Sequence, residues 1–250
     1  MRRVKNYLSL ALVIIMVAAS ILYEDKSINT MGSIDRSPIY SVDRQDNTIA
    51  FTFDINWAEK DNINSILEVL DKYNVKGTFF IIGKWVDYSE ENQKKLKLIS
   101  ERGHEIGNHS YNHPLFSKIG EDKIKEELRK TNEVIEKVTG EKPKLFRFPS
   151  GDYNEQSSRV VSTEGYIPVQ WDVDSVDWKE LGADIEYNRV IKGVKSGSII
   201  LFHNNAKYTP GNLEKLLNEL SNEGYKFLTV GQLIYQENYN IDQDGKQFEK

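Results

Sequence analysis

The chain contains no cysteine among its 250 residues, so it can form neither a disulfide framework nor a thiolate metal site. Histidine is scarce as well, and the four residues are His104, His109, His113 and His203. Any metal ion must therefore be bound by imidazole or carboxylate groups. Positively charged residues are outnumbered as well, since the chain has 33 Lys and Arg residues against 38 Asp and Glu residues, which gives a net charge of −5. Because proteins that bind a phosphate backbone carry a clustered cationic face, this balance argues against nucleic acid as a partner.

A single long hydrophobic run stands at the N-terminus, at residues 7–23, behind a basic start at residues 1–5. Cations followed by an apolar stretch are typical of an export signal. The small residues at 18–20 would suit cleavage, whereas the length of the run favours an uncleaved anchor. We therefore expect residues 1–23 to be a signal peptide or membrane anchor. The protein would then act outside the cytoplasm, either membrane-anchored or secreted.

The rest of the chain divides into a stalk, a domain and a tail. Residues 24–47 are polar without periodicity and predict a stalk, and residues 236–250 predict a flexible tail. Between them, residues 48–235 alternate short apolar runs with amphipathic segments. This alternation predicts a parallel sheet closed into one α/β barrel with helices outside, which we expect to be monomeric. The expected strands are at 48–53, 77–82, 105–107, 145–148, 166–171, 198–202 and 226–228.

Polar residues follow five of these predicted strands. They are Asp54, the pair His109 and His113, the segments 147–153 and 172–178, and His203. Because the active site of a parallel barrel forms where the strands end, these residues are the candidates for chemistry. Two histidines four residues apart can place two imidazoles on one cation. The segment 172–178 carries three carboxylates, and its spacing leaves open whether it is an acidic loop or orients Arg147 beside a sugar-binding Trp178.

The same segments form five motifs in a fixed order. They read Thr52-Phe53-Asp54, His109-Ser110-Tyr111-Asn112-His113-Pro114, Arg147-Phe148-Pro149-Ser150-Gly151, Asp174-Ser175-Val176-Asp177-Trp178 and Leu201-Phe202-His203. In this order, and on this βα pattern, they resemble the motifs of the NodB-homology polysaccharide deacetylases, carbohydrate esterase family four. The resemblance covers about residues 48–233, which is nearly all of the predicted domain.

This resemblance implies a distorted (β/α) barrel that hydrolyses the N-acetyl group of amino sugars in a polysaccharide. By position, Asp54 would be the general base and His203 the general acid, with Arg147 and Asp174 holding Asp54. Family members bind a divalent metal, and the matching ligands here would be two histidines, His109 and His113. Substrate contacts would come from the backbone N–H of Ser150 and from Tyr153, Trp178 and Leu201.

The first motif departs from the family at its metal ligand. The usual second aspartate is replaced by Ile55, so that the motif continues Asp54-Ile55-Asn56-Trp57. Asn56 could lend a carbonyl oxygen, Asp54 could ligate directly, or water could fill the position. Because neutral oxygens bind Zn²⁺ more weakly than carboxylate, we expect the metal to be weakly held or absent, with Zn²⁺ ahead of Co²⁺ or Ni²⁺. Together with residues 39–43, this substitution resembles the sporulation-associated PdaB-type branch of the family.

The sequence thus predicts an extracytoplasmic enzyme that removes acetyl groups from peptidoglycan, on N-acetylglucosamine or N-acetylmuramic acid, with a link to sporulation. The alternative is a catalytically weak or inactive deacetylase-like module that binds cell-wall glycan. A glycosidase is a third possibility, since Asp54 and Asp174 could supply the two carboxylates that such enzymes need.

Overall fold

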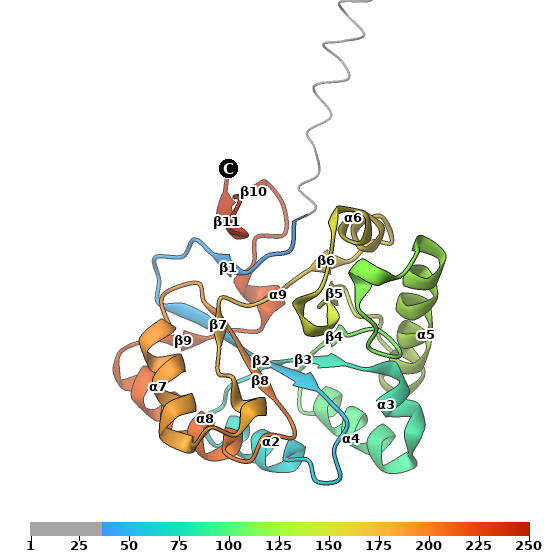
Figure 1. Cartoon of the computed structure of the whole chain (residues 1–250). Coiled ribbons are helices and arrows are strands. Elements are labelled where there is room, and N and C mark those ends of the chain that lie inside the picture. Colours follow the sequence, from blue (N-terminus) through green and yellow to red (C-terminus); the bar gives the residue numbers. More distant parts are fainter. Residues whose placement is uncertain (1–36) are drawn as a thin grey trace, which may run out of the picture. The chain divides into compact units, whose positions relative to one another are not determined.

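The computed structural model describes residues 37–250, which centre on a curled parallel sheet (Figure 1). The strands are β1 (Ser41–Val42), β2 (Thr48–Ile55), β3 (Thr78–Ile81), β4 (Glu105–Asn108), β5 (Leu145–Phe146), β6 (Ile167–Pro168), β7 (Val173–Asp174), β8 (Ile199–His203), β9 (Lys226–Phe227), β10 (Tyr239–Ile241) and β11 (Lys246–Glu249). The main sheet has the order β6-β5-β4-β3-β2-β8-β7, with β9 also paired to β2, and all its pairs are parallel. A second, small sheet has the order β1-β11-β10.

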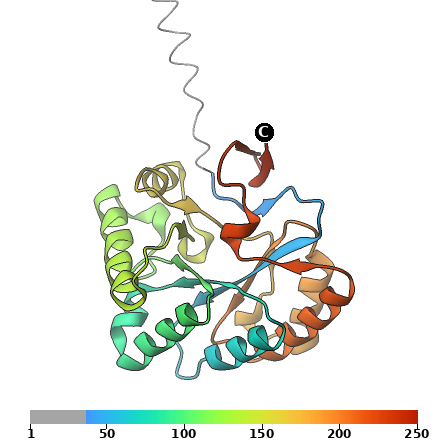
Figure 2. The same cartoon turned by 180° about the vertical axis from the view of Figure 1, so that it is seen from behind.

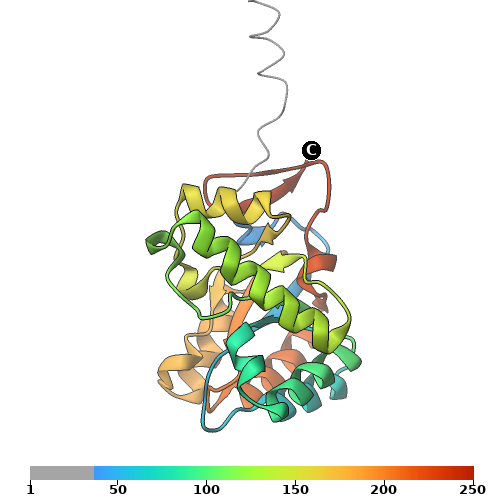
Figure 3. The ribbon, with the colours of Figure 1, turned by 90° about the vertical axis from the view of Figure 1, so that its right-hand side faces the viewer.

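Helices connect the strands and lie outside the curl of the main sheet (Figure 1 and Figure 2). They are α2 (Ile63–Lys72), α3 (Gly83–Tyr88), α4 (Glu90–Glu101), α5 (Glu121–Thr139), α6 (Glu155–Thr163), α7 (Ala183–Gly193), α8 (Thr209–Asn222) and α9 (Val230–Leu233), with short 3₁₀ turns η1 (Phe116–Lys118), η2 (Pro149–Gly151) and η3 (Asp177–Lys179). The longest, α5, crosses the side of the sheet and packs against α3, α4 and α6 (Figure 3). This arrangement confirms the predicted (β/α) barrel class, in a form that is open between β6 and β7.

The central strand β2 is buried on both faces, as is typical of a parallel strand covered by helices. Phe51, Phe53 and Ile55 join the apolar cluster between the sheet and the outer helices. Because successive side chains of a strand point to opposite faces, Thr52 and Asp54 face the inside of the curl. The alternation therefore places Asp54 where the strand opens toward the interior and turns Ile55 away from it.

Both predicted domain boundaries need correction. Residues 37–47, expected to be stalk, contain β1, and the buried Ile39 donates its N–H to the Pro168 carbonyl at 2.9 Å. Val42 donates to the carbonyl of Gly197, whose φ of +84° and contact with Val42 leave no room for a Cβ atom. Residues 236–250 are not a flexible tail, because β10 and β11 pair with each other and with β1.

The predicted signal or anchor at residues 1–23, and the first part of the stalk, lie outside the described residues. Of the helices within residues 37–250, none combines the length and the hydrophobicity that crossing a bilayer requires.

Candidate active site

A cavity of about 400 Å³ opens at the carboxyl ends of the strands. It is lined by Asp54, Asn56, His109, His113, Ser150, Trp171, Asp174, Trp178, Leu201 and His203. The structure thus brings together nine of the residues predicted from the sequence, which lie in segments up to 149 positions apart, Asp54 to His203. Of the predicted residues, Arg147 and Tyr153 do not line it, and Trp171 is an addition. Parallel strands explain the convergence, because their carboxyl ends share one edge of the sheet.

Asp54 at the end of β2 forms a buried ion pair with Arg147, which follows β5. The Nη1 group of Arg147 donates to Asp54 Oδ1 at 2.8 Å, and the arginine side chain is fully buried. Burial alone would raise the pKa of Asp54, but the charge of Arg147, with smaller contributions from His109 and His203, holds that pKa below its ordinary value. Asp54 is therefore a carboxylate at neutral pH.

Besides Asp54, Arg147 contacts a backbone carbonyl, a threonine hydroxyl and an aromatic ring. Its Nη2 group donates to the Gln170 carbonyl at 3.0 Å, its Nη1 group donates to Thr52 Oγ1 at 2.8 Å, and its guanidinium lies 4.0 Å from the Phe80 ring centre. Among the hydrogen bonds of residues 37–250, Asp174 accepts instead from the N–H of Val176, at 2.8 Å. Of the two residues expected to hold Asp54, Arg147 is therefore hydrogen-bonded to it, whereas Asp174 acts on the arginine only through its charge.

His203 at the end of β8 has its own buried carboxylate partner, Asp177. The Nδ1 atom of His203 lies 2.7 Å from Asp177 Oδ1, and the His203 N–H donates to Asp177 Oδ2 at 2.8 Å. Thr209 donates to the same Oδ2. Burial lowers the pKa of His203, but hydrogen bonding and charge from Asp177, followed by the charges of Asp54 and Asp174, raise it above its ordinary value overall. The sequence did not single out Asp177 among the three carboxylates of its segment.

His109 and His113 face each other with ring centres 4.9 Å apart. The Nδ1 atom of His109 lies 2.9 Å from the Arg147 carbonyl, which requires an N–H at that position. Its Nε2 atom then presents a lone pair to Asp54 Oδ2 at 3.5 Å. Burial lowers the pKa of His109 to about 4, so that the ring is neutral. A carbonyl that fixes the tautomer in this way is typical of metal-binding histidines.

The turn that carries His113 is held from α5. Ser110 and His113 both have left-handed φ angles, +65° and +60°, which residues other than glycine rarely adopt. The buried Glu127 accepts from the N–H groups of Tyr111 and Asn112 at 2.9 and 2.6 Å. Ser110 Oγ accepts from the His113 N–H at 2.9 Å. These bonds stabilise a turn that places both imidazoles on the cavity.

The His, Asp and Glu side chains on the cavity do not form a complete metal site. Two imidazoles and Asp54 converge, but within residues 37–250 no three His, Asp or Glu side chains are grouped closely enough to hold a metal ion. Ile55 packs in the apolar cluster and not on the cavity. Asn56 does line the cavity. Its backbone is held by the Asn204 side chain, which accepts from the Asn56 N–H at 2.7 Å and donates to the Asn56 carbonyl at 3.2 Å.

The remaining predicted substrate contacts divide into two groups. Ser150, Leu201 and Trp178 line the cavity, and the Trp178 side chain is 56% exposed. Tyr153 does not line it, since its ring stacks on Phe148 with centres 5.1 Å apart. The expected role of Tyr153 in direct substrate contact is therefore not supported by its position in the structure.

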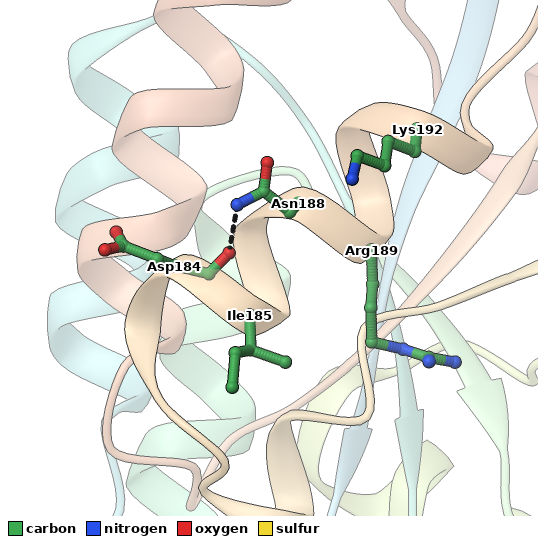
Figure 4. A pocket seen from close by; sticks show the side chains of 5 residues that line it. All are labelled: Asp184, Ile185, Asn188, Arg189 and Lys192. Atoms are coloured by element: carbon green, nitrogen blue, oxygen red, sulfur yellow. Dashed lines mark hydrogen bonds between the residues drawn. The ribbon is translucent and has the colours of Figure 1, made fainter.

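A second hollow lies on the outer face of α7 (Figure 4). It is lined by Asp184, Ile185, Asn188, Arg189 and Lys192, none of which was predicted as a site residue. Asn188 donates to the Asp184 carbonyl within the helix, as the dashed line in Figure 4 marks. The side chains on this face come from one helix, whereas those of the first cavity converge from several strands, so we assign the chemistry to the first cavity.

Comparison with known proteins identifies the family. The polysaccharide deacetylase family matches residues 41–169, and the chain is 32% identical to the peptidoglycan-N-acetylmuramic acid deacetylase PdaA of Bacillus subtilis, covering 81% of this chain and 77% of PdaA. The chain therefore belongs to the polysaccharide deacetylase family. It is also 36% identical to the uncharacterised protein YlxY of Bacillus subtilis, over 82% of this chain. It spans 62% of the length of YlxY.

A solved structure carries a further comparison. A mutant of BA3943, described as a family-four pseudoenzyme with restored enzymatic activity, superposes with a TM-score of 0.75 at 33% identity, covering 80% of this chain and 72% of that one. BA3943 comes from Bacillus anthracis. The solved structure of PdaA superposes with a TM-score of 0.74, so the same fold occurs in PdaA, named as a deacetylase, and in BA3943, named as a pseudoenzyme.

Proposed function

We propose that this chain hydrolyses the N-acetyl group of amino sugars in peptidoglycan. One observation carries the proposal: an ionised Asp54 paired with Arg147 and a His203 paired with Asp177 face a single cavity. Amide hydrolysis needs both a base for water and an acid for the departing nitrogen. The name of the relative PdaA supports peptidoglycan as the substrate.

In the proposed mechanism, Asp54 takes a proton from the attacking water. The backbone N–H of Ser150, at the turn η2 on the cavity wall, donates a hydrogen bond to the developing oxyanion. His203, protonated on the ring nitrogen that does not face Asp177, gives its proton to the amine as the C–N bond breaks. Trp178 and Leu201 enclose the acetyl methyl group.

His109 and His113 would hold a divalent cation, with Zn²⁺ ahead of Co²⁺ and Ni²⁺. Such a cation polarises the substrate carbonyl and acidifies bound water. Asn56 is the candidate for an additional oxygen ligand because it lines the cavity. Since a neutral amide oxygen is a weaker ligand than carboxylate, the cation would exchange readily.

The second candidate function is a glycan-binding module without catalysis. The incomplete ligand set and the likeness to BA3943, named as a pseudoenzyme, favour it. Such a module would bind insoluble peptidoglycan regardless of chelator and of His109→Ala. The presence of Asp54 and His203, each with a buried charged partner, favours the enzyme, because glycan binding alone needs none of these groups.

A glycosidase fits the site poorly. Its acid must be a protonated carboxyl group, whereas Arg147 keeps Asp54 ionised. Asp174 would then have to supply the acid, but its Oδ1 atom already accepts a hydrogen bond from the Val176 N–H at 2.8 Å.

Three finer assignments complete the proposal. Residues 1–23 would export the protein and anchor it to the membrane unless cleaved, so that the domain meets the cell wall. The chain would belong to the sporulation-associated PdaB-type branch, which it resembles in Ile55 and in residues 39–43. We expect the domain to act as a monomer.

The test is acetate release from purified peptidoglycan, with Zn²⁺, Co²⁺ or Ni²⁺ added and with chelator. The Asp54→Asn variant is the matched control because it keeps the size of the side chain. Release well above the control supports hydrolysis, and metal dependence supports the imidazole site. Release equal to the control under every metal condition would reject the enzyme in favour of the binding module.

A further inference from the structure

The exposed large hydrophobic side chains of residues 37–250 all lie at one end of the barrel. They are Trp57, Tyr88, Leu115, Trp178, Leu181 and Ile185. In the sequence, each lies between the carboxyl end of a strand and the first turn of the helix that runs back along the sheet. Single exposed apolar residues are ordinary, but a set confined to the end that holds the cavity marks an interaction surface.

Two of these side chains form an aromatic pair outside the cavity. The rings of Trp57 and Tyr88 have centres 5.1 Å apart and are nearly perpendicular, at 88°. The tryptophan is 40% exposed and the tyrosine 75%. Each ring restrains the other, so ordering them costs a ligand little conformational entropy.

Trp57 is tied to the cavity through its neighbour in the chain. Asn56 lines the cavity, and its N–H and carbonyl are both hydrogen-bonded to the Asn204 side chain. Asn204 itself follows His203 directly and is fully buried. The backbone that presents Trp57 is therefore fixed to the same strand ends as the acid and the base.

Tyr88 is tied to the cavity through the histidine turn. At the start of α3, the Gly83 N–H donates to the Ser110 carbonyl at 3.0 Å. Near its end, Asp87 Oδ2 accepts from the Tyr111 hydroxyl at 3.0 Å. Ser110 and Tyr111 lie between the two cavity histidines in sequence, so the aromatic pair is connected to the site from both sides.

We propose that Trp57 and Tyr88 form a subsite for a sugar ring of the glycan strand adjoining the one in the cavity. This inference rests on the proposed function, since it takes the same polymer as ligand. The C–H faces of a pyranose ring are apolar and stack on aromatic rings, while the hydroxyl groups at its edge stay in water. A cavity of about 400 Å³ suits a small molecule, so a polymer held there must continue across the surface outside it.

The test measures affinity by calorimetry, in the inactive Asp54→Asn background, for glycan strands freed of peptides by an amidase. A single N-acetylated amino sugar and a strand of six sugar units are compared. Trp57→Ala and Tyr88→Ala should each weaken binding of the strand about tenfold and leave binding of the single sugar unchanged. Trp57→Phe should recover most of the loss, because it keeps a flat ring. Thermal unfolding of each variant checks that the fold is kept.

Equal affinity of the alanine variants and the parent for the strand would overturn the subsite, and so would an equal loss for the strand and the single sugar. Because no turnover is involved, this outcome is independent of acetate release. A chain that binds longer strands through Trp57 and Tyr88 but releases no acetate retains the subsite and loses the proposed hydrolysis.

Discussion

The two halves of the cavity differ in how completely they are built. In the acid and base half, Asp54 and His203 each have a buried, oppositely charged or hydrogen-bonded partner within 2.8 Å. In the imidazole half, His109 and His113 are oriented by the backbone and by Glu127, yet Ile55 is turned into the apolar core. The proposed proton-transfer groups thus each have a buried partner, whereas the proposed metal ligands lack a third side chain.

This difference shows what the site depends on. A buried carboxylate without a partner is costly, so Asp54 and Arg147 must be retained together. A lost metal ligand can be replaced in part by water or amide oxygen, so the imidazole half tolerates change. We therefore expect variants of the first half to have larger effects than variants of the second.

The largest effect should come from Asp54→Asn. Removing the base should lower the rate of acetate release about 1,000-fold, since proton transfer by a positioned group contributes about 100- to 10,000-fold. The variant also leaves Arg147 without a charged partner, so its midpoint of thermal unfolding should be recorded alongside. A folded variant with nearly full activity would contradict the expectation that changes in the acid and base half have the larger effects.

Asp177→Asn should lower the rate about 100-fold and change its pH dependence. The acid must be protonated, and the pKa of His203 is raised by Asp177, Asp54 and Asp174 against the effect of burial. Without the Asp177 charge the pKa of His203 falls, so the loss of activity on the alkaline side should begin at lower pH. A rate profile from pH 5 to 10 measures the shift. An alkaline limb that stays in place, or that moves to higher pH, would show that His203 is not the acid.

In the imidazole half, Asn56→Asp and Ile55→Asp form a matched pair. Asn56 lines the cavity, so a carboxylate there should raise the affinity for Zn²⁺ about tenfold in calorimetry. Ile55 is buried among apolar side chains, so the same change there should destabilise the fold by about 3 kcal/mol without tighter Zn²⁺ binding. Tighter binding by a stable Ile55→Asp variant would contradict the orientation described for β2.

Asp174→Asn should have the smallest effect. Asp174 is half-buried and acts on Arg147 and His203 only through its charge, so the rate should fall less than about fivefold. An amide oxygen can still accept from the Val176 N–H, which keeps the turn. A fall in rate as large as that caused by Asp177→Asn would indicate that Asp174 acts directly on Asp54.

The principal strands and most of the cavity residues could be predicted from the sequence. Asp54 and His203 each follow a run of β-branched, aromatic and aliphatic residues, and a parallel sheet collects the residues that follow such runs at one edge. The strand β7 was not predicted, because residues 172–177 alternate acidic or serine residues with single valines and contain no apolar run. The strands β10 and β11 were missed for a related reason, since short edge strands are defined by their pairing partners.

The sequence by itself determined the βα order and the residues at the strand ends, because each is a local property of the chain. Only the tertiary structure decided that Asp177 holds His203 while Asp174 does not hold Arg147. Three carboxylates within six residues are equivalent in sequence, and the left-handed turn at Val176, with φ of +56°, determines which one reaches the histidine. The aromatic pair likewise joins loops that follow two different strands, and only the packing of those strands brings them together.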